Sequence, residues 1–142
     1  MTKCNASLEA TIELPIARSN SYKKDEMPVL YGNNIFVTIT FYGYGDLVTT
    51  VHECFDQFDH SCILGKDNPL YTAYKENFAA NGIDLARSRV FVLDKDPTLE
   101  DLTEYFGNLF YGYVHKTSAI EVPVFEIKLD DACGNVTKLV YN

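Results

Sequence analysis

The residues best suited to chemistry in this sequence are an adjacent aspartate and histidine, Asp59 and His60. A carboxylate that orients an imidazole fixes its tautomer and basicity, so such a pair can take up and release a proton near neutral pH. Because adjacent side chains rarely hydrogen-bond well with each other, a distant carboxylate such as Asp130 is an alternative partner for the histidine. The interpretation without chemistry is that both residues form the solvated end of a helix.

Cys62 follows His60 by two residues, a spacing that puts both side chains on one face of a strand. A cysteine beside a histidine can act as a nucleophile, but a cysteine in an apolar segment is more often a buried structural residue. We interpret the other two histidines, His52 and His115, as surface or half-buried residues, with His115 in a loop. The four cysteines contain no CxxC pair, so cysteine spacing predicts no zinc site.

Length and charge limit the class of protein. The chain has 142 residues, which favours one domain over residues 1–142. Its 12 basic and 20 acidic residues give a net charge of −8, which argues against a nucleic-acid partner. No apolar run approaches the roughly 20 residues of a membrane span, and the first residues are too polar for a secretion signal. We therefore expect a cytoplasmic protein with no membrane contact and with reduced thiols.

The elements that must position these residues follow from the apolar periodicity. Alternation of apolar and polar residues predicts strands, and apolar residues three or four apart predict helices. Expected strands cover residues 7–16, 34–42, 87–93, 121–130 and 136–141, and expected helices cover 47–58, 69–80 and 99–113. The polar residues 17–28 read as a long loop. This order favours an α+β domain in which an antiparallel sheet carries helices on one face.

Two helix starts have capping signals. Asp46 precedes the first expected helix and is a suitable N-cap. Thr98 and Asp101 resemble a capping box at the start of the third helix, where Glu100 also suits the positive helix end.

Three segments in this order resemble the 6-pyruvoyl- and 6-carboxytetrahydropterin synthases, members of the tunnelling-fold (T-fold) superfamily. Asp59-His60, followed by Leu64, is similar to the LDH segment after the first helix of that family. PTLEDL, residues 97–102, is similar to its PTxENL helix start, and YGNNI, residues 31–35, stands where the family has HGHNY. The resemblance covers most of the chain, from about Leu14 onward.

The resemblance implies a fold and an assembly. Family subunits have a four-stranded antiparallel sheet with two main helices on one face, and their sheets join into a barrel. We therefore expect a homo-oligomer, a trimer or a hexamer, with sites at the subunit interfaces. Such an assembly would also close exposed sheet edges.

The sequence departs from the family at its metal centre. Family members bind zinc through three histidines, and the two in HGH correspond to Tyr31 and Asn33 here. The third lies in an AHR-like segment whose best match, residues 16–18, puts Ala17 at the ligand position. Tyr, Asn and Ala do not rebuild a zinc site. The family cysteine that lies four residues before HGH corresponds to Met27, which cannot move a proton.

The resemblance therefore implies a zinc-independent enzyme, with no cofactor, for a small planar substrate of the pterin kind. It would catalyse elimination, tautomerisation or cyclisation, as a lyase or cyclase does. His60 would be the acid/base, and Asp59 and Asp130 would orient or anchor, since Asp130 is the nearest match to the family glutamate that holds the pterin. The residues expected to bind substrate are Tyr31, Asn33 and Glu100.

Three alternatives to this hypothesis stay open. The chain can be a non-catalytic pterin- or purine-binding protein or a scaffold, since both the metal ligands and the cysteine are lost. Zinc chemistry can also survive through an unrecognised ligand set. Finally, Asp130 can simply cap the turn that follows it, because Asp and Gly are common turn residues.

Overall fold

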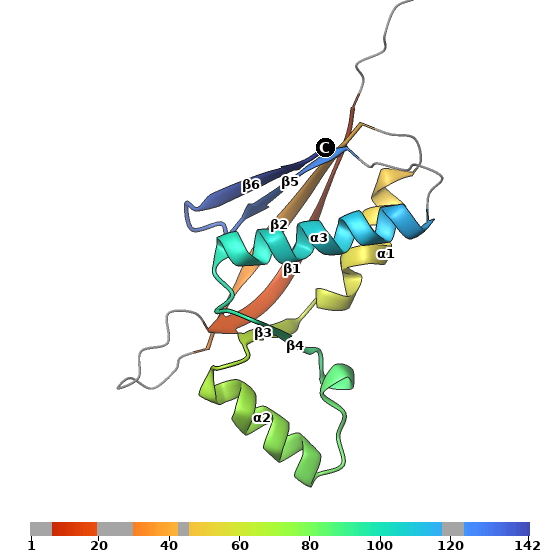
Figure 1. Cartoon of the computed structure of the whole chain (residues 1–142). Coiled ribbons are helices and arrows are strands. Elements are labelled where there is room, and N and C mark those ends of the chain that lie inside the picture. Colours follow the sequence, from red (N-terminus) through yellow and green to blue (C-terminus); the bar gives the residue numbers. More distant parts are fainter. Residues whose placement is uncertain (1–6, 20–29, 43–45, 118–123) are drawn as a thin grey trace, which may run out of the picture.

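The structure, a computed structural model, describes residues 7–19, 30–42, 46–117 and 124–142. Within these ranges the strands form one six-stranded sheet in the order β4-β3-β1-β2-β5-β6 (Figure 1). The strands are β1 (Leu8–Ser19), β2 (Tyr31–Phe41), β3 (Ser61–Gly65), β4 (Val90–Leu93), β5 (Phe125–Asp130) and β6 (Val136–Tyr141). The helices are α1 (Leu47–Phe55), α2 (Pro69–Ala80) and α3 (Leu99–Thr117), with short 3-10 helices η1 (Asp56–Phe58) and η2 (Leu85–Ser88).

The sheet is larger than the four antiparallel strands that the resemblance implied. Strands β1, β2, β5 and β6 are antiparallel neighbours, as expected. However, β3 and β4 extend the sheet beyond β1 by parallel pairing. The sequence analysis missed β3 because its five residues are too few to show a strand period. The sheet is therefore mixed, and the expectation of a purely antiparallel one is wrong.

Strand β1 also runs three residues further than predicted, to Ser19. The expected loop at residues 17–28 is therefore wrong at its start, because Arg18 pairs with Tyr31 and Ser19 pairs with Leu64. The side chain of Arg18 continues the buried face that Ile12, Leu14 and Ile16 begin. Residues 20–28 of this loop, Met27 included, lie outside the described residues.

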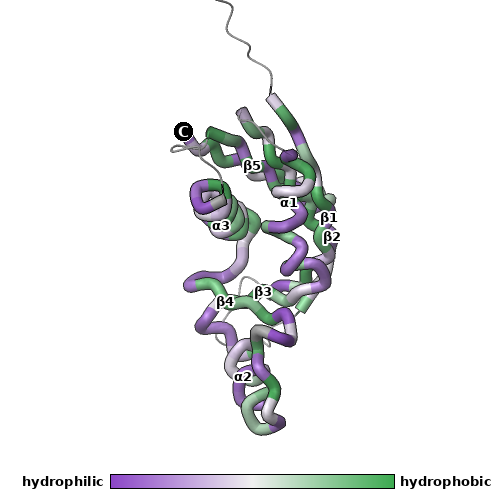
Figure 2. The backbone as a smooth tube through the Cα atoms, turned by 90° about the vertical axis from the view of Figure 1, so that its right-hand side faces the viewer, coloured by the Kyte–Doolittle hydropathy of each residue, from purple (hydrophilic) through white to green (hydrophobic). Residues whose placement is uncertain are grey.

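The core lies between one face of the sheet and the two helices α1 and α3. Figure 2 shows both helices on the same side of β1 and β2. Aromatic rings fill the space between them: the centroid of Phe106 lies 5.4 Å from that of Phe55 and 4.8 Å from that of Phe58. Such buried ring contacts stabilise the packing beyond the area they bury. The expected placement of these helices on one face is confirmed.

Both predicted helix caps are present. The Asp46 carboxylate accepts a hydrogen bond from Thr49 N at 3.2 Å and caps α1. At the start of α3, the Thr98 hydroxyl accepts from Asp101 N at 3.2 Å and donates to the Asp101 carboxylate at 2.9 Å. These caps fix where each helix begins.

Helix α2 differs from the other two helices. Its N-cap Asn68 accepts from Leu70 N at 2.9 Å, but none of its residues is buried. Figure 1 shows it extending away from the sheet, beyond β3 and β4. Within the described part of the chain, no helix is long and apolar enough to cross a membrane.

Candidate functional site

Polar side chains gather around an open cavity of about 810 Å³ at one end of the sheet. We call it the Arg18 cavity. Six of its lining residues matter for the argument: three come from the sheet, one from the start of α3 and two from the turn between β5 and β6. They are Arg18, Tyr31, Asn33, Glu100, Asp131 and Cys133. The three expected substrate-binding residues, Tyr31, Asn33 and Glu100, are therefore brought together.

Arg18 is the most buried charged residue of this cavity, with 3% of its surface exposed. Its Nη1 donates to the backbone carbonyl of Pro97 at 2.9 Å, and its guanidinium carbon lies 5.6 Å from the centre of the Tyr31 ring. Its Nε is also buried but finds no hydrogen-bond partner within the described structure. A buried donor without a partner is costly, so this atom marks a place where a ligand acceptor would be favourable.

Asp131, which follows β5, supplies the negative charge beside Arg18. Its carboxylate accepts from Cys133 N at 2.8 Å, from Asn135 N at 3.1 Å and from Asn135 Nδ2 at 2.8 Å. Burial alone would raise the pKa of Asp131, but these hydrogen bonds and the charge of Arg18 outweigh it and lower the pKa. Asp131 is therefore held as a carboxylate that shapes the turn.

Asn33 lies between the strand and this turn. Its Nδ2 donates to the backbone carbonyl of Asp131 at 3.1 Å, whereas its Oδ1 is buried and finds no partner among the described residues. The hydrogen bond of Nδ2 fixes the orientation of the amide. The unpaired acceptor of Asn33 and the unpaired donor of Arg18 therefore belong to one cavity.

The positions of the family metal ligands can now be compared on the sheet. Residues that pair across antiparallel strands point to the same face. Arg18 pairs with Tyr31, and Asn33 pairs with Ile16, so Arg18 shares a face with both former HGH positions. Ala17 pairs with Gly32 and points to the other face. Three ligands of one metal must reach the same side of the sheet, so Ala17 cannot complete a ligand set with positions 31 and 33, whereas Arg18 lies on their side.

These residues do not fit zinc. A guanidinium stays protonated and offers no lone pair, and Asn and Tyr are not among the usual zinc ligands. Among the described residues, no group of three His, Cys, Asp or Glu side chains lies close enough to hold a metal ion. The face that would have to carry the metal holds the buried guanidinium of Arg18.

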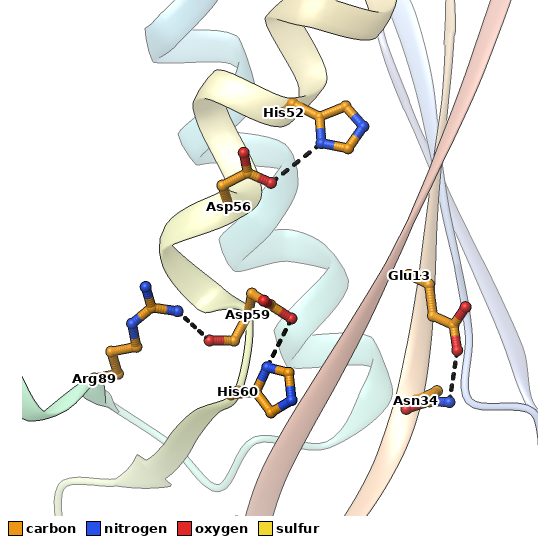
Figure 3. A network of polar contacts seen from close by, with 7 residues as sticks. All are labelled: Glu13, Asn34, His52, Asp56, Asp59, His60 and Arg89. Carbon is orange, nitrogen blue, oxygen red and sulfur yellow. Dashed lines mark hydrogen bonds and ion pairs between the residues drawn. The ribbon is translucent and has the colours of Figure 1, made fainter.

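His60 lines a second, smaller hollow of about 360 Å³, which we call the His60 hollow. His60 Nδ1 lies 3.1 Å from Asp59 Oδ1, so the two adjacent side chains do contact each other (Figure 3). Their side chains are 76% and 46% exposed, respectively. Arg89 donates to the backbone carbonyl of Asp59. The pair is thus formed, but it lies largely in solvent.

The backbone of His60 is left-handed, with φ of 56°. A non-glycine residue is uncommon there, although His tolerates this region better than β-branched residues do. The conformation turns the chain between η1 and β3. The pair therefore also forms the turn between η1 and β3.

The two hollows open on opposite faces of the sheet and share Gly32 and Asn33 in their linings. The His60 hollow also contains Ala17, which faces away from Arg18. Within one chain, the expected acid/base and the expected substrate-binding residues are therefore close in the fold but are not on one face.

Asp130 occupies a third environment. Its carboxylate accepts from Ala132 N at 2.8 Å, which is the turn-capping geometry. It pairs with Phe36 on β2, whose side chain points away from the buried face of Ile35 and Val37. The carboxylate that His60 contacts is that of Asp59. The carboxylate of Asp130 caps the turn that follows β5.

The remaining candidate residues have structural environments. Burial raises the pKa of Cys62 to about 11 and that of Cys54 to about 12, so neither is a thiolate at neutral pH. His52 contacts Asp56 one turn later on α1, with 3.1 Å between Nδ1 and Oδ1 (Figure 3). His115 lies in the last turn of α3, not in the expected loop, with its ring stacked on that of Tyr111.

Two residues of the Arg18 cavity were missed by the sequence analysis as site residues. The signal for Arg18 was available, since the period of two in Ile12, Leu14 and Ile16 continues to position 18. Asp131 follows the last apolar residue of β5, Leu129, and only its place in the turn shows that it faces Arg18. Its role could not be found without the tertiary structure.

The fold has known counterparts among solved structures. The 6-pyruvoyl tetrahydropterin synthase of Plasmodium vivax superposes with a TM-score of 0.62 at 14% identity, over 96% of this chain and 99% of that one. The same enzyme of Plasmodium falciparum gives 0.57 at 16% identity, over 97% and 100% of the two chains. An uncharacterised protein of Wolinella succinogenes gives 0.61 at 12% identity, over 96% and 99%.

The chain is therefore an α+β protein of the tunnelling-fold class. More particularly, its fold is similar to that of a 6-pyruvoyl tetrahydropterin synthase subunit, at a sequence identity of 14% to 16%. No protein-family model matches the sequence, and no curated protein matches it either. The expected likeness to the fold of these synthases is confirmed, whereas the expected sheet of four antiparallel strands is not.

Proposed function

We propose that this chain is a zinc-independent relative of the 6-pyruvoyl tetrahydropterin synthases that binds a small planar substrate in the Arg18 cavity and acts on it by proton transfer. The observation that carries this proposal is the occupation of the former metal face by Arg18, Tyr31 and Asn33 around one cavity. The chemistry would be an elimination, tautomerisation or cyclisation, as expected of a lyase or cyclase without a metal.

The cavity suits a small planar molecule. Its volume of about 810 Å³ lies within the usual range of ligand sites, and a few polar groups converge on it. Tyr31, a residue with 38% of its surface exposed, offers an aromatic ring, and such rings stack on flat heterocycles. Glu100, at the start of α3, adds an exposed carboxylate at the rim.

The proton-transfer group would be His60 with Asp59 as its orienting carboxylate. Their contact of 3.1 Å supports this role. Because the pair lies on the face opposite to Tyr31, the Arg18 cavity of one chain and the His60 hollow of another would have to meet in an oligomer. This agrees with the trimeric or hexameric assembly that we propose from the resemblance.

An edge of the sheet supports the assembly. Strand β6 lies at one end of the sheet, and its Val136 and Val140 are 51% and 61% exposed. An exposed edge strand with apolar side chains is a place where another chain pairs. The measured mass in solution, expected to be three or six times that of the 16.1 kDa chain, tests this assembly.

A second candidate function is ligand binding without catalysis. The exposure of His60 and the turn-capping contact of Asp130 favour it, because both residues then have only structural roles. The Arg18 cavity would still bind a pterin- or purine-like molecule in this case.

One experiment separates the two candidates. Wild-type protein is mixed with a panel of 7,8-dihydropterins that differ in the C6 side chain; binding is followed by fluorescence and turnover by chromatography. The enzyme hypothesis expects His60→Ala to abolish turnover while binding persists. His52→Ala is the matched control, since His52 also contacts a carboxylate at 3.1 Å. Binding without turnover in the wild type supports the second candidate, and no binding by any of these pterins, nor by purines added to the panel, overturns both.

A further inference from the structure

We infer that Arg18 and Asn33 form a clasp for the lactam edge of an uncharged heterocycle, the adjacent C=O and N–H of a cyclic amide. This inference rests on the proposed function of the Arg18 cavity and specifies which ligands it selects. Arg18 Nε would donate to the ligand carbonyl, and Asn33 Oδ1 would accept from the ligand N–H.

The clasp consists of two buried polar atoms, one in each of two residues that line this cavity, for which the described residues supply no hydrogen-bond partner. Arg18 Nε and Asn33 Oδ1 are both buried, and neither finds a partner within the described structure. One can only donate, and the other can only accept. Native proteins rarely bury such atoms without a partner, so an unpaired donor and acceptor in one cavity point to a ligand with the complementary pair.

Both side chains are held in place by their other polar atoms. Arg18 Nη1 is fixed by the Pro97 carbonyl at 2.9 Å, on the side of the guanidinium away from the Nε–H. Asn33 Nδ2 is fixed by the Asp131 carbonyl at 3.1 Å, which leaves Oδ1 as the free end of the amide. Because Arg18 and Asn33 lie on adjacent strands with the same facing, two residues apart in register, a single flat ligand edge can reach both.

The charges around the cavity favour an uncharged ligand. Its lining contains one cation, Arg18, and two carboxylates, Asp131 and Glu100. The Asp131 carboxylate already lies close enough to Arg18 for their charges to interact. An anionic ligand would therefore meet excess negative charge in a chain that is itself acidic, whereas a neutral carbonyl still accepts from a guanidinium N–H.

The chemistry of the edge makes the inference specific. A lactam presents an acceptor oxygen beside a donor N–H. The corresponding amino compound presents a donor NH₂ beside an acceptor ring nitrogen, which reverses both roles. The clasp would face a donor with a donor and an acceptor with an acceptor, so it should reject the amino form. A site built to pair with a polar edge discriminates strongly against the analogue that cannot pair.

The test compares oxo and amino forms of two ring systems: pterin with 2,4-diaminopteridine, and hypoxanthine with adenine. Dissociation constants are measured by calorimetry with the full chain. We expect the wild type to prefer the oxo form of whichever ring it binds by at least about tenfold, a difference of about 1.4 kcal/mol. Arg18→Lys keeps the positive charge but removes Nε, and should reduce this preference to less than about threefold.

Asn33→Leu removes the acceptor and should weaken the preference in the same way, which keeps the test valid if Arg18→Lys does not fold. His52→Ala, at an exposed residue of α1 outside the cavity lining, should keep the full preference. Equal binding of oxo and amino forms by the wild type would overturn the clasp while the ligand-binding function stands. A preference that persists in both clasp variants would also overturn it. Binding of none of the four compounds would overturn the proposed function and the clasp together.

Discussion

The Arg18 cavity and the His60 hollow lie at the same end of one sheet, yet their polar groups are held in opposite ways. Arg18 is 3% exposed and tied to a carbonyl from another part of the chain, whereas the His60 side chain is 76% exposed and contacts its own neighbour in sequence. Burial makes an unsatisfied hydrogen bond costly, and exposure lets water satisfy it. The two faces therefore differ in how strongly structure constrains their chemistry.

This difference in burial indicates which positions of the site can change their residue without loss of stability. A buried charged side chain needs hydrogen-bond partners, and the Arg18 guanidinium finds one in the carbonyl of Pro97. An exposed acid-base pair can be kept or substituted with little change in the free energy of unfolding. Four predictions test this comparison, from the largest expected effect to the smallest.

The largest effect is expected from restoring a metal site. The triple variant Arg18→His, Tyr31→His and Asn33→His places three imidazoles on one face and should bind about one zinc per chain with micromolar or tighter affinity. The control carries Ala17→His with the same changes at Tyr31 and Asn33, and should bind zinc at least about a hundredfold more weakly because Ala17 points to the other face. Titration with a zinc indicator measures both, and tighter binding by the control would refute the assignment of faces.

The second-largest effect is expected in the reactivity of two cysteine thiols, one beside each hollow. Cys133 is exposed in the turn beside the Arg18 cavity, whereas Cys62 pairs with Ala17 on the side of the His60 hollow. Burial raises the pKa of Cys62 to about 11, so at pH 8 about one molecule in a thousand carries its thiolate. Alkylation by iodoacetamide, mapped by mass spectrometry, should modify Cys133 at least about a hundredfold faster. Comparable rates would show that Cys62 is accessible and activated.

Stability should follow the same division. Arg18→Met leaves the buried Asp131 carboxylate without its nearby cation and should lower the free energy of unfolding by about 3 kcal/mol. His60→Ala removes an exposed side chain and should change it by less than about 0.5 kcal/mol. Urea unfolding followed by circular dichroism measures both values. Similar losses in the two variants would mean that the His60 hollow is as constrained as the cavity.

The smallest effect concerns acid. Because the folded state lowers the pKa of Asp131, its carboxylate contributes stability that is present above the unfolded value of about 3.9 and lost as pH falls through the folded value. The difference in unfolding free energy between the wild type and Asp131→Asn should therefore be largest at neutral pH and shrink below about pH 4. Asp59→Asn, an exposed control, should cost at most about 1 kcal/mol at neutral pH. A difference that stays constant down to pH 2 would contradict the assignment to Asp131.

Much of the fold could be predicted because its main elements are long and periodic. The alternation in β1, β2 and β5 and the apolar stripes of α1 and α3 were sufficient for their placement. Strand β3 was missed because five residues carry too little pattern, and its parallel pairing with β1 depends on a distant segment. The end of β1 was missed because Arg18 and Ser19 are polar, although both are buried.

The candidate site was predicted in part. Tyr31, Asn33 and Glu100 do line one cavity, and Asp59 does contact His60. The face on which each residue lies depends on the strand register. The motif alignment chose Ala17, which is one residue away from Arg18, the residue that shares a face with Tyr31 and Asn33. The contact of Arg18 with Pro97 could not be foreseen, because it joins the sheet to the residue before the helix cap of α3.

The contact between Arg18 and Pro97 also limits when the chain can complete its fold during synthesis. Arg18 and Pro97 are separated by 79 residues, so at synthesis rates of about 5 to 20 residues per second the arginine waits roughly 4 to 16 seconds for its carbonyl. Strands β1 and β2 can pair before Pro97 is synthesised. The side chain of Arg18 then already lies on the face of the hairpin that becomes buried in the folded protein. A nascent chain that has not yet reached Pro97 therefore lacks the carbonyl that Arg18 Nη1 bonds in the folded protein.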